Sequence, residues 1–90
     1  MRCNLIYCES SVQKSVIYDI LEERQEQDKK FGDQDHEPLM WLAIIGEEFG
    51  EASQEIIEDR PKEYREELVQ LAAACVAALE SFDKNKGDIK

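Results

Sequence analysis

The chain contains few metal-binding or disulfide-forming side chains and has no long apolar run. Its 90 residues include three cysteines and one histidine, His36. The cysteines (Cys3, Cys8 and Cys75) form no CxxC pair, so we expect no zinc site, and their odd number is typical of reduced thiols. Disulfide-based and zinc-based folds are therefore not expected.

The apolar runs are too short for export or for a bilayer. Residues 5–7 are too few for the apolar core of a signal peptide. The weakly polar run at 71–79 falls far below the roughly 20 residues that span a membrane. We therefore expect a cytoplasmic protein with no membrane partner.

Positive charge is also scarce. Eleven Lys and Arg residues stand against 21 Asp and Glu residues, which gives a formal net charge of −10. Direct nucleic-acid binding is not expected, because phosphate recognition needs a basic patch. A cationic partner, such as a metal ion, suits this charge, and an acidic mimic of DNA is a further alternative.

The first two predicted segments are amphipathic helices. Ser10, followed three residues later by Gln13, forms a capping-box pattern that opens a helix with apolar residues at spacings of three and four. We expect this helix to stop at Gly32. A loop then leads to Pro38, which favours the first turn of a helix running from about 38 to 58.

The third helix is predicted from about 61 to 82, because proline at position 61 cannot continue a helix but can begin one. The fold class is therefore all-α, a small bundle of about three main helices. We expect residues 1–90 to form one domain, with an N-terminal arm at 1–9 and a loose tail at 83–90.

Each of the last two helices carries two stripes, an apolar seam and a stripe beside it. On the second helix the seam is Leu42, Ile45, Phe49, Ala52 and Ile56, and the neighbouring stripe is Trp41, Ile44, Glu48, Glu51 and Glu55. On the third helix the seam is Tyr64, Leu68, Leu71, Cys75, Ala78 and Phe82, and the neighbouring stripe is Glu67, Gln70, Ala74 and Ala77. The spacing is that of a helix bundle.

Antiparallel packing of these helices would bring four oxygen-bearing side chains to one point: Glu48, Glu51, Glu67 and Gln70. Crowded carboxylates are unfavourable unless they are protonated or bridged by a cation. Ligand sets made only of oxygen select Mg²⁺ or Mn²⁺. The alternative is a solvated acidic face without a metal.

The segments WLAIIGEEFGEA (41–52) and EELVQLAA (66–73) resemble the MazG-like proteins of the all-α nucleoside triphosphate pyrophosphohydrolase superfamily. The segment EERQEQDKKFGDQDH is similar to the lead-in helix and loop of short, phage-type members. Glu47, Glu48 and Glu51 match the EExxE half of the family motif, and Glu67 matches the start of its ExxD half. Gln70 departs from the motif, which has Asp at this position.

The resemblance implies hydrolysis of a nucleoside triphosphate to a monophosphate and pyrophosphate, for nucleotide-pool house-cleaning. Mg²⁺ would be held by Glu48, Glu51, Glu67 and Gln70, and the catalytic glutamates would be Glu47, Glu48 and Glu51. Trp41 is expected to stack on the base or to pack in the core. Lys30 and Lys84 are expected to contact phosphates or to remain solvated.

The resemblance also implies four-helix cores that are completed by oligomerisation, in a homodimer or homotetramer. The alternative function is a catalytically weak or inactive oligomeric helical module with a binding or structural role. Gln70 is the residue that favours this alternative, because an amide brings no charge to a metal.

Overall fold

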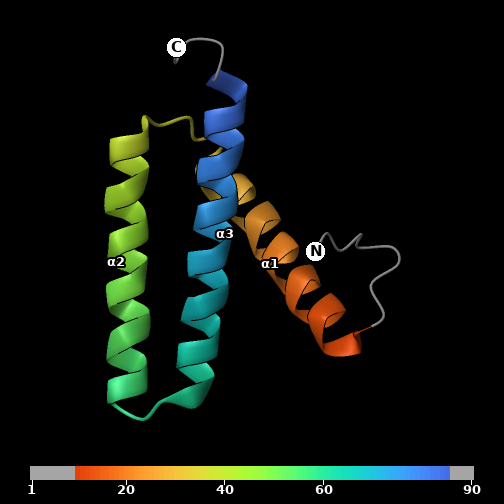
Figure 1. The fold of residues 1–90 in the computed structure, drawn as a ribbon, viewed down its shortest axis with the longest axis vertical. Helices are drawn as coiled ribbons and strands as arrows, with labels where there is room; N and C mark the ends of the chain where they lie inside the picture. The colour runs from red at the N-terminus through yellow and green to blue at the C-terminus, as the bar shows by residue number, and fades with distance from the viewer. Residues whose placement is uncertain (1–9, 86–90) are drawn as a thin grey trace.

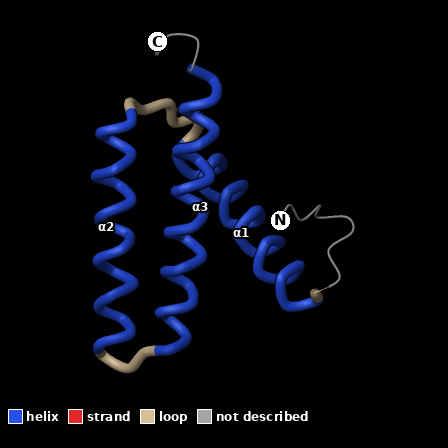
Figure 2. Tube along the Cα trace, viewed as in Figure 1, coloured by secondary structure: helices blue, strands red, loops and turns tan. Residues whose placement is uncertain are grey.

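The computed structural model describes residues 10–85, which form three helices: α1 (Ser11–Phe31), α2 (Pro38–Ile57) and α3 (Pro61–Asn85) (Figure 1). These residues contain no strand (Figure 2). The prediction of a small all-α bundle with three main helices is confirmed. No helix between residues 10 and 85 is both long and apolar enough to cross a membrane.

Helix α1 begins and ends as predicted from its local sequence. The Ser10 side chain accepts a hydrogen bond from the backbone N–H of Gln13 at 3.1 Å. Gly32 ends the helix with a φ of 75°, and its N–H donates to the carbonyl of Asp28 at 2.9 Å. Glycine adopts this left-handed conformation without the steric cost that a side chain brings.

Prolines begin the other two helices. Pro38 stands in the first turn of α2, and Pro61 opens α3 after a tight turn in which Asp59 has a φ of 58°. The predicted end of α3 was wrong, because residues 83–85 are helical and do not belong to a loose tail. The predicted arm at 1–9 and the rest of the tail at 86–90 lie outside the described residues.

The antiparallel helices α2 and α3 lie side by side as a hairpin, and α1 lies against α3 on one side of it (Figure 1). Two ion pairs join α1 to α3. Arg65 lies 2.8 Å from Asp19, and Arg24 lies 2.6 Å from Glu80. The N-terminal half of α1 diverges from the hairpin (Figure 1).

The buried residues of the bundle are mostly small. They are Trp41, Ala52, Ala73, Ala74, Ala77 and Ser81. Small side chains let helices approach closely, so the stripe of α3 that carries Ala74 and Ala77 packs inward. Among residues 10–85, Trp41 is therefore the one large side chain that is buried.

The apolar seams do not form the interior of the hairpin. Five of their large members, Leu42, Phe49, Ile56, Leu68 and Phe82, are exposed. The inward side of the hairpin is instead the neighbouring stripe, because its alanines permit a closer contact than leucine or phenylalanine. The seams form an outer apolar surface.

Candidate metal centre

Three glutamates meet between α2 and α3. Glu48 and Glu51 stand one turn apart on α2, and Glu67 reaches them from the antiparallel α3. One carboxylate oxygen from each of the three lies within 4.8 Å of the others. We call this set the glutamate cluster. The glutamate cluster can offer three hard oxygen ligands to one cation.

The glutamate cluster is electrostatically strained. Glu48 and Glu67 are half-buried, and each has an Oε2 atom that is shielded from solvent and has no hydrogen-bond partner among the described residues. Burial, a hydrogen bond with Glu51 and the negative charges of neighbouring glutamates raise the pKa of Glu67 to about 7. Burial and the charge of Glu51 also raise the pKa of Glu48. A proton or a cation therefore stabilises this cluster near neutral pH.

Helix α1 adds a carboxylate that the sequence did not lead us to expect. The charge of Glu23, on α1, contributes to the raised pKa of Glu48, so this carboxylate adds to the negative charge around the glutamate cluster. Burial, followed by the charge of Glu26, raises the pKa of Glu23 itself. The sequence pattern could have indicated this residue. Glu23 continues the helical stripe of Val12, Val16 and Ile20, just as Glu48 continues the stripe that begins at Trp41.

Gln70 is half-buried and lines a hollow of about 420 Å³ between α1 and α3. The lining of this hollow includes Glu23 and Arg65 but none of the glutamate cluster. Glu47 is exposed, and its charge contributes to the raised pKa of Glu48.

Trp41 is nearly inaccessible, with 4% of its surface exposed. Its ring meets that of His36 edge to face, with 5.0 Å between the ring centroids, and its Nε1 has no hydrogen-bond partner among the described residues. It also lines a largely apolar groove of about 1000 Å³ between α2 and α3. Trp41 thus has the burial of a core residue while its edge borders an open groove.

The two candidate lysines lie in different surroundings. Lys30 is exposed, and its ammonium lies 5.2 Å from the ring centroid of Phe31. Its charge partly offsets the rise in the pKa of Glu23. Lys84 pairs with Asp33 at 3.2 Å. Because about 25 Å of helix axis separates Lys84 from Glu67, its ammonium is remote from the glutamate cluster.

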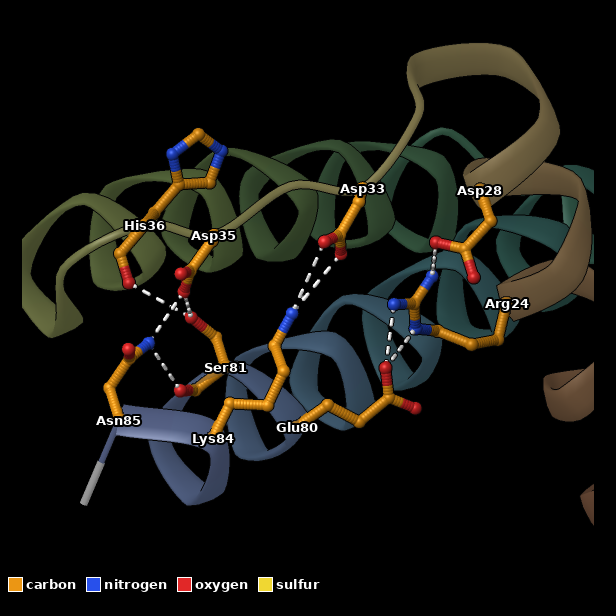
Figure 3. Close-up of polar contacts among 9 residues, drawn as sticks. All are labelled: Arg24, Asp28, Asp33, Asp35, His36, Glu80, Ser81, Lys84 and Asn85. Atoms are coloured by element: carbon orange, nitrogen blue, oxygen red, sulfur yellow. Dashed lines mark hydrogen bonds and ion pairs between the residues drawn. The ribbon is translucent and has the colours of Figure 1, made fainter. Parts of the chain in front are cut away.

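A polar network fixes the loop before α2 to the end of α3 (Figure 3). The buried hydroxyl of Ser81 donates to Asp35 Oδ1 at 2.7 Å and lies 3.1 Å from the carbonyl oxygen of His36. Asn85 donates to the same Asp35 oxygen at 2.7 Å. These two bonds lower the pKa of Asp35. The network holds the start of α2, and with it Trp41, in register with α3.

Comparisons of the chain with protein-family models, with curated proteins and with solved structures find no match. The ligand that suits the glutamate cluster must therefore be inferred from the atoms that the cluster offers. Unpartnered, shielded carboxylate oxygens on Glu48 and Glu67 fit a hard divalent cation such as Mg²⁺ or Mn²⁺, which neutralises them without needing nitrogen or sulfur ligands.

Proposed function

We propose that this protein is a Mg²⁺-dependent nucleoside triphosphate pyrophosphohydrolase that releases a nucleoside monophosphate and pyrophosphate. Mn²⁺ is a second candidate for the metal, and nucleotide-pool house-cleaning is the proposed role. The observation that carries the proposal is the glutamate cluster, whose three ligand atoms lie within 4.8 Å of one another. The resemblance of residues 41–52 and 66–73 to the MazG-like proteins supports the substrate class.

The metal would be held by Glu48, Glu51 and Glu67, and when bound it would neutralise the triphosphate charge that an acidic protein otherwise repels. In the reaction, a water oxygen attacks the α-phosphorus and the bond to the β-phosphate oxygen breaks. A glutamate of the EExxE segment (Glu47, Glu48 or Glu51) accepts the proton of the attacking water. The products are then the monophosphate and pyrophosphate.

The substrate contacts and the assembly belong to the same proposal. The edge of Trp41 and the groove beside it are the proposed base contact, and Lys30 is the proposed phosphate contact. Lys84 is the weaker candidate, because its partner is Asp33 and it lies far from Glu67 along α3. We further propose that the enzyme works in the cytoplasm as a homodimer or homotetramer.

The decisive experiment measures pyrophosphate and orthophosphate separately, from a panel of nucleoside triphosphates with and without Mg²⁺. We expect pyrophosphate as the product, and no activity in Glu51→Gln, because this change removes a ligand charge. Glu66→Gln is the matched control, since Glu66 is an exposed neighbour outside the glutamate cluster, and it should retain activity. Release of orthophosphate, or equal activity in both variants, would contradict the proposed reaction.

Gln70 favours a second candidate, a non-catalytic helical module that binds a partner. Its amide brings no charge to a cation, so the glutamate cluster has three carboxylates from the hairpin rather than the four of the family motif. Gln70→Asp separates the candidates. In an enzyme the added carboxylate should maintain or increase pyrophosphate release, whereas in a structural module it adds repulsion that Mg²⁺ does not relieve.

A further inference from the structure

An arginine stands at the turn that joins α2 to α3 (Figure 1). Arg60 directly precedes Pro61, the first residue of α3, and follows Asp59, whose φ is 58°. The backbone N–H of Arg60 donates to the carbonyl oxygen of Glu55 at 2.9 Å, which holds the turn against the last turns of α2. The backbone of Arg60 is therefore fixed, and its side chain starts from the closed end of the hairpin.

The Arg60 side chain reaches back along α2. One terminal nitrogen donates to Glu58, and the other lies 3.6 Å from Glu55 Oε1, which is too far for a good hydrogen bond. An arginine side chain has five N–H donors, and about half of this one is exposed to solvent. The guanidinium can therefore donate to a further partner at this end of the hairpin.

Glu55 connects Arg60 with the glutamate cluster. It stands one turn after Glu51 on α2, on the same stripe as Glu48. Its Oε2 atom is shielded from solvent and has no hydrogen-bond partner among residues 10–85. The charge of Glu55 contributes to the raised pKa of Glu67, so these two carboxylates interact across the hairpin. Arg60 thus brings positive charge next to a carboxylate that borders the cluster.

Trp41, the glutamate cluster and Arg60 follow one another in this order along the hairpin. Trp41 stands about 10 Å of helix axis before Glu48, and Glu55 stands about 10 Å after it. The proposed function gives the base to Trp41 and the metal-bound triphosphate to the glutamate cluster. A nucleotide that binds in this order has its β- and γ-phosphates nearest the turn and Arg60.

The β- and γ-phosphates need positive charge at this end of the hairpin. A triphosphate carries more negative charge than one divalent cation neutralises, and the surrounding glutamates add to that charge. Further negative charge develops on the leaving pyrophosphate as its bond to the α-phosphorus breaks. A guanidinium suits this task, because it can donate two parallel hydrogen bonds to phosphate oxygens. Two other arginines, Arg24 and Arg65, are held in ion pairs between α1 and α3.

We propose that Arg60 binds the β- and γ-phosphates of the substrate and stabilises the pyrophosphate as it leaves. This inference rests on the proposed function and gives the substrate a direction, with the base toward Trp41 and the leaving group toward the turn. On binding, the guanidinium exchanges Glu58 for phosphate oxygens. Arg60 transfers no proton. The proton of the attacking water goes to a glutamate, and the electron pair of the broken P–O bond leaves with pyrophosphate.

The first test measures binding of inorganic pyrophosphate to the full chain by isothermal titration calorimetry, in the presence of Mg²⁺. Arg60→Ala should weaken binding by about 10- to 100-fold, because hydrogen bonds between charged groups are lost. Arg60→Lys should recover part of the affinity, since it keeps the charge but not the planar fork. Lys62→Ala is the matched control. It removes one positive charge from an exposed residue close to the same turn, and the affinity should not change.

The second test separates phosphate binding from a structural role of Arg60 in the turn. Glu58→Gln removes the charge of its hydrogen-bond partner. By our proposal this variant binds pyrophosphate as tightly as wild type or more tightly, because the guanidinium is released. If Arg60 only stabilises the turn, Arg60→Ala and Glu58→Gln should lower the free energy of unfolding in urea, and neither should act on pyrophosphate specifically. Equal losses of pyrophosphate affinity in the two variants would overturn the proposal.

The third test uses the products as inhibitors of nucleoside triphosphate hydrolysis. Arg60→Ala should raise the inhibition constant of pyrophosphate by about 10-fold or more and leave that of the nucleoside monophosphate nearly unchanged, because the monophosphate lies on the Trp41 side. Equal changes for both products would overturn the proposed direction of the substrate.

The outcomes distinguish this inference from the proposed function. Hydrolysis with unchanged kinetics in Arg60→Ala would overturn the role of Arg60 and leave the function standing. Pyrophosphate binding that depends on Arg60, without hydrolysis of any nucleotide, would contradict the function and support the phosphate contact. A wild-type chain that binds no pyrophosphate in the presence of Mg²⁺ would overturn the phosphate contact itself.

Discussion

Raising the pH in the absence of divalent cations should destabilise the protein through Glu67. The folded-state pKa of Glu67 is raised from 4.5 to about 7, mainly by burial and by contact with Glu51. A carboxyl group with a raised folded-state pKa favours folding while it is protonated. Its contribution is therefore fully present below pH 4.5 and is lost as the pH rises to about 7 and beyond.

The magnitude follows from the size of the shift. Moving from 4.5 to about 7 corresponds to a ceiling of roughly 3 kcal/mol, at about 1.4 kcal/mol per pH unit. Solvent reaches part of the Glu67 side chain and screens the effect, so we expect roughly 1–2 kcal/mol in total, of which somewhat more than half is lost between pH 5.5 and pH 8. The total amounts to about 5–15 °C in Tm for a domain of this size. The raised pKa of Glu48 acts in the same direction.

The assay is urea or thermal unfolding at pH 5.5 and pH 8, with EDTA or with Mg²⁺. Metal-free wild type should be less stable at pH 8, and Glu67→Gln should remove most of that loss because glutamine has no proton to release. Mg²⁺ at 100 times its Kd should restore about 2.7 kcal/mol to wild type at pH 8. Glu66→Gln serves as the control, since it alters an exposed neighbour.

Two results would refute this reasoning. One is a free energy of unfolding for wild type that does not change between pH 5.5 and pH 8 without metal. The other is an equal pH dependence in Glu67→Gln and wild type. The first would mean that the glutamates lie too far apart to interact, and the second that another group is responsible for the pH dependence.

Two further substitutions test how the hairpin is held together. Ser81→Ala should lower the free energy of unfolding by about 1 kcal/mol in urea titration, because the buried Ser81 hydroxyl no longer donates to Asp35, which keeps Asn85 as its other donor. Ala74→Leu should cost about 1–3 kcal/mol, because it forces the closely packed helices apart. It should also weaken the response of Tm to Mg²⁺, since Glu67 lies on the same stripe of α3.

The helices could be predicted from the sequence because their signals are local. The Ser10 cap, the Gly32 stop and the two N-terminal prolines act within one turn, and the structure places all four as expected. The end of α3 could not be predicted in this way. Its last turn is held by Lys84 and Asn85, whose partners lie about 50 residues away in the loop before α2.

The inward side of the hairpin could not be chosen from periodicity alone. Each helix has two adjacent stripes at the same spacing, and hydrophobicity favours the one with leucine and phenylalanine. The structure buries the other, because Ala73, Ala74 and Ala77 allow α2 and α3 to approach closely. The distance between α2 and α3 depends on which residues of the two helices face each other, and the sequence does not reveal these pairs directly.

The candidate site was only partly predictable for the same reason. The convergence of Glu48, Glu51 and Glu67 could be predicted from the helical face on which each lies. Because α2 and α3 are antiparallel and joined by a short turn, residues at similar distances before and after the turn lie opposite each other. The contribution of Glu23 depends on how α1 crosses the hairpin, where the ion pairs Arg65–Asp19 and Arg24–Glu80 join α1 to α3. Ion pairs between residues far apart in the sequence leave no periodic signal.

The two proposed partners, a cation and a second chain, would bind different surfaces of one hairpin. The glutamate cluster lacks positive charge, and seam residues such as Phe49 and Ile56 are exposed. A cation or a second chain that binds the native state would raise its stability by mass action. Because the glutamates and the seam residues lie on different stripes of α2 and α3, we expect the two contributions to be nearly additive. The test is the response of Tm to Mg²⁺ in Ile56→Lys, which places a charge on the seam. A response that vanished in this variant would show that the partner chain helps to hold the cation.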